Sequence, residues 1–366
     1  MSTNNSMKST RNVACSRMSY VCTICLLLLA YYTIPIKDFH QTPGFEETEV
    51  IHTVSWHSVS KTRERIDCQG SKLNNSIEDG VRHYLDLTVP DDTMGYLNNL
   101  GFSPVESFDT VKIPYLPVVL FAASSNHFLE LQGLIRDLHQ RLMWVHPNIK
   151  LLFYDLGLTP WQNQQMVKHC NCEVRKFPYN EFPPHLRNLT TYAWKPIIIQ
   201  MALQEHHFVA YMDASIRLKI SDLTDLFLNT KDTGFMYLYG DYFNFEVMQH
   251  TDQRMLQFFR LDGCKFLTVT EKQATMVLIA DKWLSHFILM KWWVVCALNL
   301  DCIAPHGTEK LLFCDPRINK IGKCHRFDQS ALNLIIYSIF NNPENHVISR
   351  HFINTNRGQM VNYFEE

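Results

Sequence analysis

Residues 208–218 read FVAYMDASIRL, an apolar run that ends at an acidic residue. The part before the acid, 208–212, contains only apolar and aromatic side chains, which is typical of a strand buried on both faces. Asp213 and Ser215 follow directly, before a second apolar run. Acidic side chains are seldom buried without a partner, so a carboxylate at this strand end indicates a specific contact or a function.

Alternating strand and helix patterns lead up to this stretch. Earlier segments predict strands within 116–125, 148–155 and 172–177, the first of them an apolar run typical of a buried strand. The segments between them and before Phe208, namely 126–145, 160–170 and 191–206, have helical spacing or helix-start signals. This alternation predicts an α/β domain with a doubly wound, mostly parallel sheet and helices on both faces.

Polar side chains follow three of the four predicted strands. They are Ser124, Ser125 and Asn126 after the first, Asp155 after the second, and Asp213 with Ser215 after the fourth. In parallel sheets ligands bind outside the carboxyl ends of the strands, so these residues are candidate ligand contacts. No GxGxxG, GxxxxGK[ST] or GxSxG pattern occurs, so the sequence supports neither a dinucleotide fingerprint, a P-loop nor a nucleophile elbow.

The composition is that of a folded protein. Of the 366 residues, 46% are hydrophobic and 12% aromatic, which is ample for a packed core. The formal net charge is -2, so the chain lacks the basic excess that phosphate-backbone binding normally requires. Nucleic acid is therefore not the expected partner.

The N-terminal region predicts a membrane anchor. Residues 18–36 carry no charge, and as a helix they would span roughly 28 Å, close to the thickness of the hydrocarbon core. Lys8, Arg11 and Arg17 precede this segment, which places a short tail, 1–17, in the cytosol and the rest in the lumen. A cleaved signal peptide is the alternative interpretation. We expect a single-pass type II protein of the Golgi or endoplasmic reticulum membrane.

The remaining chain divides by composition. Residues 37–112 are polar and rich in turn formers, apart from a short amphipathic piece at 77–87, and predict a luminal stem. Residues 113–366 hold the α/β pattern and predict the folded luminal domain.

Cysteine usage fits an oxidising compartment. The eight cysteines after the anchor have no paired CxxC spacing, which favours disulfides over a structural metal; they are Cys68, Cys170, Cys172, Cys264, Cys296, Cys302, Cys314 and Cys324. We expect at least two of the last four to be paired, in a connectivity that sequence leaves open. Asn74 and Asn188 begin sequons for N-glycosylation in the lumen.

Four longer motifs carry a resemblance to a known family. They are YAWKPIIIQMAL, VAYMDASIRL, WWVVCALNLDCIAP and CHRFDQSALNLII. Together they resemble a metazoan family, rich in nematode and flatworm members, that is classed as a domain of unknown function and placed among GT-A glycosyltransferase-like folds. The resemblance covers residues 115–355 approximately and implies a nucleotide-diphospho-sugar transferase fold.

A weaker resemblance, to the glycogenin-like glycosyltransferases, implies a metal site. There an Asp-x-Asp after a central strand holds Mn²⁺ (or Mg²⁺) against the donor diphosphate, and the matching residues are Asp213-Ala214-Ser215. A divalent cation held by oxygen ligands neutralises the leaving diphosphate. Ser215 departs from the pattern, because a hydroxyl is a weaker ligand than a carboxylate. The alternative is that Asp213 caps the following turn or pairs with Arg217.

The same resemblance implies a nucleotide site. Ser124, Ser125 and Asn126 correspond to the polar residues around the base and ribose, with an ordinary helix N-cap as the alternative. Asp155, at the neighbouring strand end, is assigned to the same site. Lys195 matches a basic residue that touches the nucleotide; the alternative is a solvated lysine in the first turn of a helix.

Two late motifs complete the implied site. Asp328 and Gln329 match an Asp-Gln pair that lines the sugar or acceptor pocket, where Asp328 would orient a hydroxyl or act as a base. The alternative for Asp328 is an aspartate favoured by the helix macrodipole. His351 corresponds to a third metal ligand.

These expectations combine into two functional hypotheses. The first is a luminal glycosyltransferase that moves a sugar from a nucleotide sugar to a glycan, glycoprotein or glycolipid. The second is a non-catalytic protein of the same fold that binds a glycan or a nucleotide sugar without turnover.

Overall fold

The structure is a computed structural model, and it describes residues 76–102, 111–239, 245–308 and 324–365. All described residues belong to one compact unit, Arg63–Glu366. The predicted cytosolic tail, the predicted anchor at 18–36 and the sequon at Asn74 lie outside the described residues. Among the described helices none is long and apolar enough to cross a membrane.

The domain is built on a mostly parallel sheet, as the sequence predicts. The four predicted strands are β1 (Val118–Ala123), β2 (Lys150–Asp155), β3 (Glu173–Lys176) and β4 (Phe208–Met212). Three further strands, β6 (Phe235–Leu238), β7 (Gln273–Ala280) and β8 (Val347–Ile348), extend it to the order β3-β2-β1-β4-β7-β6-β8. Within this sheet β7 alone runs antiparallel to its neighbours.

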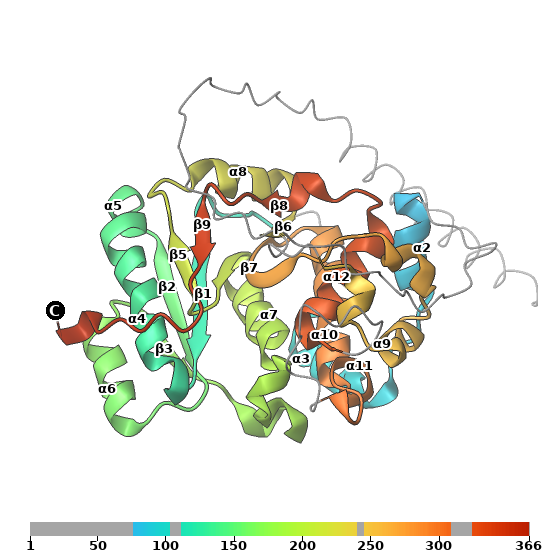
Figure 1. The fold of residues 1–366 in the computed structure, drawn as a ribbon, viewed down its shortest axis with the longest axis horizontal. Coiled ribbons are helices and arrows are strands. Elements are labelled where there is room, and N and C mark those ends of the chain that lie inside the picture. The colour runs from blue at the N-terminus through green and yellow to red at the C-terminus, as the bar shows by residue number, and fades with distance from the viewer. Residues whose placement is uncertain (1–75, 103–110, 240–244, 309–323, 366) are drawn as a thin grey trace, which may run out of the picture. The chain divides into compact units, whose positions relative to one another are not determined.

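A small ribbon lies at the carboxyl end of the sheet. β5 (Ile216–Leu218) follows β4 directly and pairs antiparallel with β9 (Ile353–Thr355), so a segment near the C-terminus returns to the end of the central strand. The two strands lie side by side in Figure 1. This pairing decides which late residues come close to Asp213.

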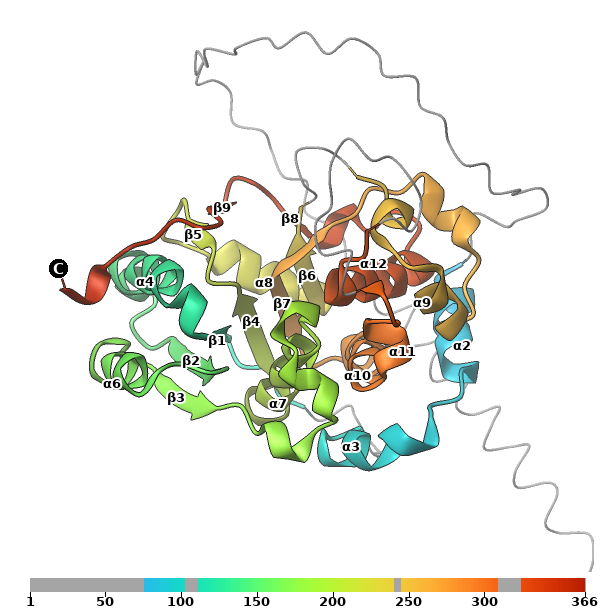
Figure 2. The same cartoon turned by 60° about the horizontal axis from the view of Figure 1, so that its bottom comes forward.

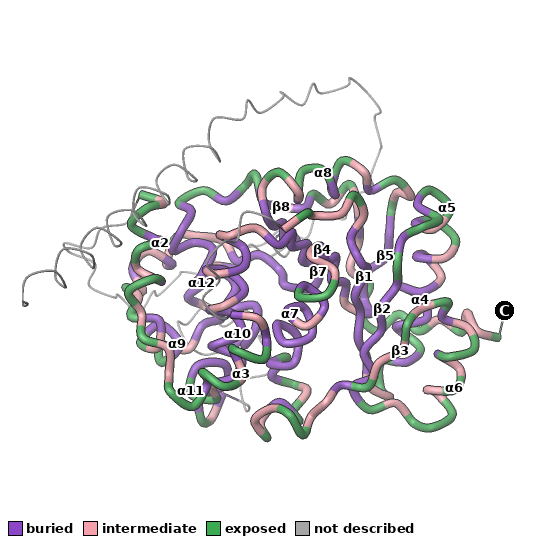
Figure 3. Tube along the Cα trace, turned by 180° about the vertical axis from the view of Figure 1, so that it is seen from behind, coloured by how far each residue is buried: buried purple, intermediate pink, exposed green. Residues whose placement is uncertain are grey.

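Helices cover both faces of the sheet because its strands are apolar on both sides. In β1 the residues Leu120 and Ala122 belong to one core cluster, whereas Phe121 and Ala123 belong to the other. The first face packs against α7 (Trp194–His206), α10 (Lys291–Leu298) and α12 (Phe327–Ile339). The second packs against α4 (Phe128–Asp137), α6 (Pro160–His169) and α8 (Thr224–Thr233). Figures 2 and 3 show these layers and the buried strands between them.

The other described elements are shorter. They are α5 (Met143–Val145), α9 (Gln253–Phe258), α11 (Leu300–Ile303), the π-helical turns η3 (Leu138–Leu142) and η9 (Ser285–Met290), and the 3₁₀ turns η2 (Ser125–His127), η4 (Tyr179–Glu181), η5 (Pro184–Arg187), η6 (Leu189–Thr191), η7 (Val247–His250), η8 (Gly263–Leu267), η11 (Glu344–His346) and η12 (Tyr363–Glu365).

Part of the predicted stem belongs to the folded domain, which differs from the sequence-based expectation. The segment 76–102 forms α2 (Ile77–Asp86), η1 (Asp91–Thr93) and α3 (Met94–Asn99). Tyr84 and Leu97 are buried in the same core cluster as α10 and α12. At Gly80, a Cβ would lie 2.5 Å from the carbonyl oxygen of Ser338, so α2 approaches α12 as closely as only glycine permits. The segment packs because its few apolar residues fall on one helical face.

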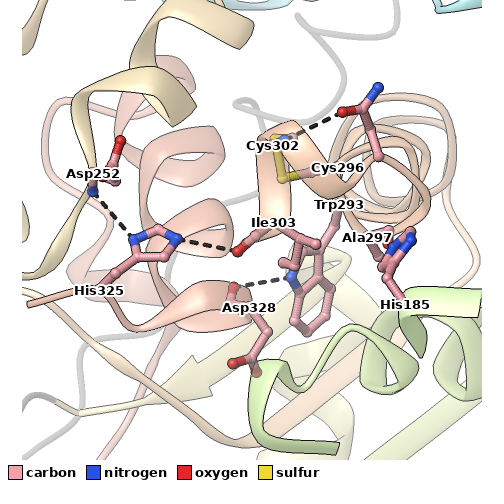
Figure 4. Close-up of a disulfide and its surroundings, with 10 residues drawn as sticks. His185, Asp252, Trp293, Cys296, Ala297, Cys302, Ile303, His325 and Asp328 are labelled. Carbon is pink, nitrogen blue, oxygen red and sulfur yellow. Dashed lines mark hydrogen bonds between the residues drawn. A yellow bond between two sulfur atoms is a disulfide. The ribbon is translucent and has the colours of Figure 1, made fainter. Parts of the chain in front are cut away.

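Two disulfides join described cysteines, Cys170 to Cys172 and Cys296 to Cys302. Cys264 and Cys324 are also disulfide-bonded. The prediction that at least two of the four late cysteines are paired is therefore confirmed. Cys296 and Cys302 tie α10 to α11, beside the start of α12 (Figure 4).

Candidate functional site

Strand alternation positions Asp213. Tyr211 belongs to the core cluster shared with α7 and α12, and Asp213, two residues later, lies on the same side of the sheet. The Tyr211 hydroxyl donates to Asp213 Oδ1 at 2.5 Å, and Lys195 Nζ lies 3.2 Å from the same oxygen. Among the described residues no hydrogen bond or ion pair reaches Asp213 Oδ2. One carboxylate oxygen is thus fixed by the protein and the other is left for a ligand.

Lys195 joins two carboxylates in the interior. It lies in the first turn of α7 and is only 3% exposed, so the solvated-lysine alternative is wrong. Its ammonium group lies 3.0 Å from Asp328 Oδ2, 3.2 Å from Asp213 Oδ1 and 3.1 Å from the carbonyl oxygen of Ala274. Burial by itself lowers the pKa of Lys195, but the charges of the two aspartates raise it to about 12. Lys195 is therefore a cation at neutral pH, with one hydrogen bond to the Ala274 carbonyl oxygen and ion pairs with both aspartates.

Asp328 occupies the other end of this bridge. It lies in the first turn of α12 and is 3% exposed, and its carboxyl group points away from the Cys296–Cys302 disulfide (Figure 4). The indole N–H of Trp293 donates to the Asp328 carbonyl oxygen at 3.0 Å, which fixes the start of the helix. Burial raises the pKa of Asp328 to about 6, and the nearby Lys195 limits the rise. Asp328 lies in the first turn of α12, as the macrodipole alternative requires, and it also forms an ion pair with Lys195. The macrodipole alternative therefore explains only part of the environment of Asp328.

Gln329 follows with an unsatisfied donor. The residue is 6% exposed, and its side-chain nitrogen Nε2 has no hydrogen-bond partner among the described residues. Buried polar groups in folded proteins are nearly always paired, so an orphaned amide beside a buried carboxylate indicates a place where a ligand supplies the partner. We call Lys195, Asp213, Asp328 and Tyr211 the carboxylate–lysine cluster; Gln329 adjoins it in sequence.

Two backbone outliers flank the cluster. Tyr192 has φ of 53° and Phe327 has φ of 42°, left-handed values that are costly for aromatic residues. Tyr192 precedes α7, and Phe327 is the residue before Asp328. Lys195 Nζ lies 5.2 Å from the centre of the Tyr192 ring, and this ring is partly exposed. Strained backbone on both sides of one ion pair is typical of a functional site.

Sequence reasoning missed two cationic residues at this edge of the sheet. His127, in η2 after β1, is half-exposed, and its Nδ1 lies 2.8 Å from Glu130 Oε2. The hydrogen bond to Glu130 raises the pKa of His127, and the charge of Asp213 adds to the rise, so the imidazole lies within electrostatic reach of the cluster. The sequence could have indicated His127 as a site residue, because it directly follows the polar residues at the end of β1.

Arg357 is the second missed residue. The Asn356 N–H donates to the carbonyl oxygen of Ser215 at 2.8 Å, and the Gly358 N–H donates to Glu130 Oε1 at 2.7 Å, so the backbone on either side of Arg357 is anchored near the end of β4. The Arg357 side chain is exposed, and its charge acts on the Tyr192 hydroxyl. Nothing in the local sequence pointed to this residue, because only the β5–β9 pairing brings it here.

The predicted nucleotide residues lie at the expected sheet edge with different partners. Ser124 Oγ donates to Asn126 Oδ1 at 2.6 Å, and Ser124 makes no side-chain cap of η2. The Ser125 backbone bonds to the loop after β2, through the Gly157 carbonyl oxygen. Asp155 is buried, and its carboxylate accepts from the backbone N–H groups of 157 and 158 and from Asn163. Asp155 therefore holds its own loop, and its contact with a nucleotide stays a prediction.

His351 lies beyond the end of the β5–β9 ribbon. Arg217 pairs with Asn354 in this ribbon, and the register continues to Lys219, whose N–H donates to the carbonyl oxygen of Phe352. His351 lies in the turn before β9, is exposed, and its N–H donates to Ser349 Oγ at 3.0 Å. The register brings the residues after β9 to Ser215, and the assignment of His351 as a metal ligand stays a prediction.

Arg217 is engaged elsewhere, so it is not the partner of Asp213. Its guanidinium donates to the carbonyl oxygens of Ala214, Ile216 and Glu130, at 2.8, 2.7 and 3.0 Å. A Cβ at Gly133 would lie 2.2 Å from this guanidinium, so the glycine provides its space. Arg217 therefore binds α4 to the β5 ribbon.

The residues present do not fit a protein-held divalent cation. In the described ranges no group of three His, Cys, Asp or Glu side chains is placed to hold a metal ion. Asp213 offers one open oxygen, Ser215 is 6% exposed, and Asp328 is paired with Lys195. Mn²⁺ or Mg²⁺ prefers several oxygen ligands, and an ammonium group already lies between the two carboxylates.

Asn188 is exposed, and its side-chain oxygen accepts from Thr190 Oγ1 at 2.7 Å. The sequon is accessible on this surface, and its glycosylation stays a prediction.

Comparison with known proteins gives a limited family match. Residues 104–200 match a family model described as a protein of unknown function (DUF1647). No curated protein matches this chain. The metazoan distribution expected from the sequence motifs stays a prediction.

Several solved glycosyltransferase structures are similar at low identity. The apo bifunctional glycosyltransferase WbbM is 14% identical, with 67% of this chain covered and a TM-score of 0.39, and this chain spans only 39% of its length. Mouse xyloside xylosyltransferase 1 is 13% identical over 64% of this chain and 86% of its own, with a TM-score of 0.37. Core-mannan synthase A from Aspergillus fumigatus, in an Mn/GDP form, is 10% identical over 69% and 77%, with a TM-score of 0.38. We transfer neither residues nor activities from these structures.

The raised pKa of Asp328 leads to a pH prediction. Its folded-state pKa of about 6 exceeds the ordinary value of 3.8, so the folded protein binds this proton more tightly, and this group's contribution to stability falls as pH rises from about 4 to about 6. Asp328→Asn removes the titration. Relative to the wild type, the variant is expected to gain up to about 3 kcal/mol of unfolding free energy between pH 4 and pH 7.

Urea unfolding of both proteins at the two pH values measures this difference. Burial lowers the pKa values of His325 and His346 to about 4, but both histidines are present in both proteins, so their contributions cancel. Asp86→Asn, at an exposed carboxylate, is the matched control. A difference between Asp328→Asn and wild type that is independent of pH would contradict the prediction.

Proposed function

We propose that this protein is a glycosyltransferase that binds a nucleotide sugar at the carboxyl edge of its parallel sheet. The observation that carries the proposal is the carboxylate–lysine cluster, in which Asp213 keeps one oxygen open while Lys195 and Tyr211 fix the other. A partly exposed, pre-positioned carboxylate of this kind suits the recognition of sugar hydroxyl groups, which donate hydrogen bonds to it.

Different residues of this sheet edge contact different parts of the proposed nucleotide sugar. The base and ribose lie toward Ser124, Ser125 and Asn126 at the end of β1, and the diphosphate lies near His127 and Arg357, the exposed cations of this edge. The sugar lies against Asp213 and Gln329, whose orphaned Nε2 donates to a sugar oxygen. The acceptor is a glycan, glycoprotein or glycolipid, and the protein is anchored in the Golgi or endoplasmic reticulum membrane with this domain in the lumen.

One observation favours the non-catalytic alternative, in which the fold binds a glycan or nucleotide sugar without turnover. Asp328, the expected base, is 3% exposed and paired with Lys195 at 3.0 Å. A general base needs access to the proton that it abstracts, and this carboxylate has none in the present arrangement.

Binding and turnover measurements on the full-length protein separate the two functions. Thermal unfolding is recorded with UDP- and GDP-linked sugars, because a ligand that binds the folded state raises its apparent stability by mass action. We expect at least one nucleotide sugar to raise the melting temperature and to release its nucleoside diphosphate in the presence of an acceptor glycan. Binding without release supports the non-catalytic alternative, and no binding of any nucleotide sugar contradicts both.

A further inference from the structure

Most carboxylates at this edge of the sheet already have protein partners. Glu130 accepts from His127 and from the Gly358 N–H. Asp155 accepts two backbone N–H groups and the Asn163 amide. Asp328 forms an ion pair with Lys195, although its Oδ2 has no hydrogen-bond partner among the described residues. Within the described part of the chain, few carboxylate oxygens are therefore open to a divalent cation.

Lys195 occupies the place between two aspartates where a cation stabilises them. A divalent ion on Asp213 would lie close to this ammonium group and be repelled by it at the low effective dielectric of a buried site. Moving Lys195 aside would leave it without its three acceptors, the Asp213 and Asp328 carboxylates and the Ala274 carbonyl oxygen. We therefore expect the ammonium group of Lys195 to take the place of a bound metal ion, and not to be displaced by one.

Two accessible basic residues complete the arrangement. His127 follows β1 and Arg357 follows β9. His127 Nδ1 and the Gly358 N–H both contact the Glu130 carboxylate, and the Asn356 N–H donates to the Ser215 carbonyl oxygen, so both residues lie near the end of β4. Arg357 is exposed and His127 is half-exposed, so both can reach a ligand that Lys195, fully enclosed, cannot. Guanidinium and imidazolium groups form charge-assisted hydrogen bonds with phosphate oxygens.

We infer that this protein binds the diphosphate of a nucleotide without a divalent metal ion. Arg357 and His127 contact the phosphates, and Lys195 holds Asp213 and Asp328 in position in place of the ion. This inference rests on the proposed function, because it concerns the diphosphate of the same nucleotide-sugar site. It replaces the Mn²⁺ site that the Asp213-Ala214-Ser215 motif suggested.

The test measures binding of UDP and GDP to the full-length protein by calorimetry, first with EDTA and then with Mn²⁺ or Mg²⁺. We expect the dissociation constant of the bound nucleotide to change by no more than about twofold between these conditions, because the phosphate charge is met by side chains. Mn²⁺ alone, followed by electron paramagnetic resonance, is expected to stay free in solution. Nucleotide binding that is lost in EDTA and restored by Mn²⁺ would overturn the inference while leaving the proposed function standing.

Two variants test the named cations. Arg357→Gln is expected to weaken UDP or GDP binding by about tenfold or more in EDTA, because it removes a charge-assisted contact without altering a buried group. His127→Gln is expected to act in the same direction. Lys168→Gln, at an exposed lysine of α6, is the matched control and should bind as the wild type does. Unchanged binding by both Arg357→Gln and His127→Gln contradicts the inference, and no nucleotide binding by the wild type under any condition contradicts the proposed function itself.

Discussion

Lys195→Met is expected to lower the free energy of unfolding by about 3–5 kcal/mol, because it leaves the buried carboxylate of Asp328 and the partly exposed carboxylate of Asp213 without their cation. Methionine keeps the length and the apolar stem of lysine, so the loss reports the charge rather than a cavity. Asp328 is 3% exposed, and in this variant it would lose Lys195, its ion-pair partner among the described residues. The measurement is equilibrium unfolding in urea at pH 7, followed by circular dichroism.

A second substitution identifies the cause. In Lys195→Met/Asp328→Asn the buried negative charge is removed together with the lysine, and most of the lost stability is expected to return. Lys168→Met, at an exposed lysine, should leave the unfolding free energy within about 0.5 kcal/mol of the wild type. If Lys195→Met were as stable as this control, the buried bridge would not be a stabilising element of the fold.

Asp213→Asn is expected to reduce turnover of the nucleotide sugar by roughly a hundredfold, as removal of one preorganised electrostatic group does. The Tyr211 hydroxyl donates to Oδ1 and the Lys195 ammonium group lies 3.2 Å from the same oxygen, so an asparagine is expected to place its carbonyl oxygen toward them. Its amide then presents a hydrogen-bond donor where the carboxylate presented an acceptor. The variant keeps the shape and both internal contacts, so it is expected to remain folded.

Steady-state release of the nucleoside diphosphate, measured as kcat/KM for the donor, gives the size of this effect. Asp86→Asn, at an exposed carboxylate of α2, is the control and should retain full turnover. Thermal unfolding of Asp213→Asn confirms that the comparison is between folded proteins. An Asp213→Asn enzyme that melts at a lower temperature but turns over normally would assign Asp213 a structural role only.

The sequence was sufficient for the sheet because local pattern and tertiary environment agree there. Largely apolar runs predicted β1, β2 and β4, since a strand buried on both faces needs apolar residues at most positions, whereas β3 is a partly exposed edge strand. Asp213 stood out in the sequence because it ends such a run. The segment 76–102 was harder to interpret, because its few apolar residues become a helical core face only when α10 and α12 are there to cover them.

The site itself depended on contacts between distant segments. Sequence identified Asp213, Lys195 and Asp328 separately, and the resemblance gave them separate roles, but nothing in it showed that one ammonium group bridges both carboxylates. It also gave no signal for Arg357, because spacing along the chain cannot reveal an antiparallel register.

The sequence by itself therefore determined the order of the strands and helices along the chain and the acidic residue at the central strand end, both of which follow from hydrophobic pattern within short windows. Tertiary structure alone decided the partners of that acid. Electrostatic interactions act through space over a few ångströms and depend on burial, so they are set by which distant segments the fold brings together around Asp213.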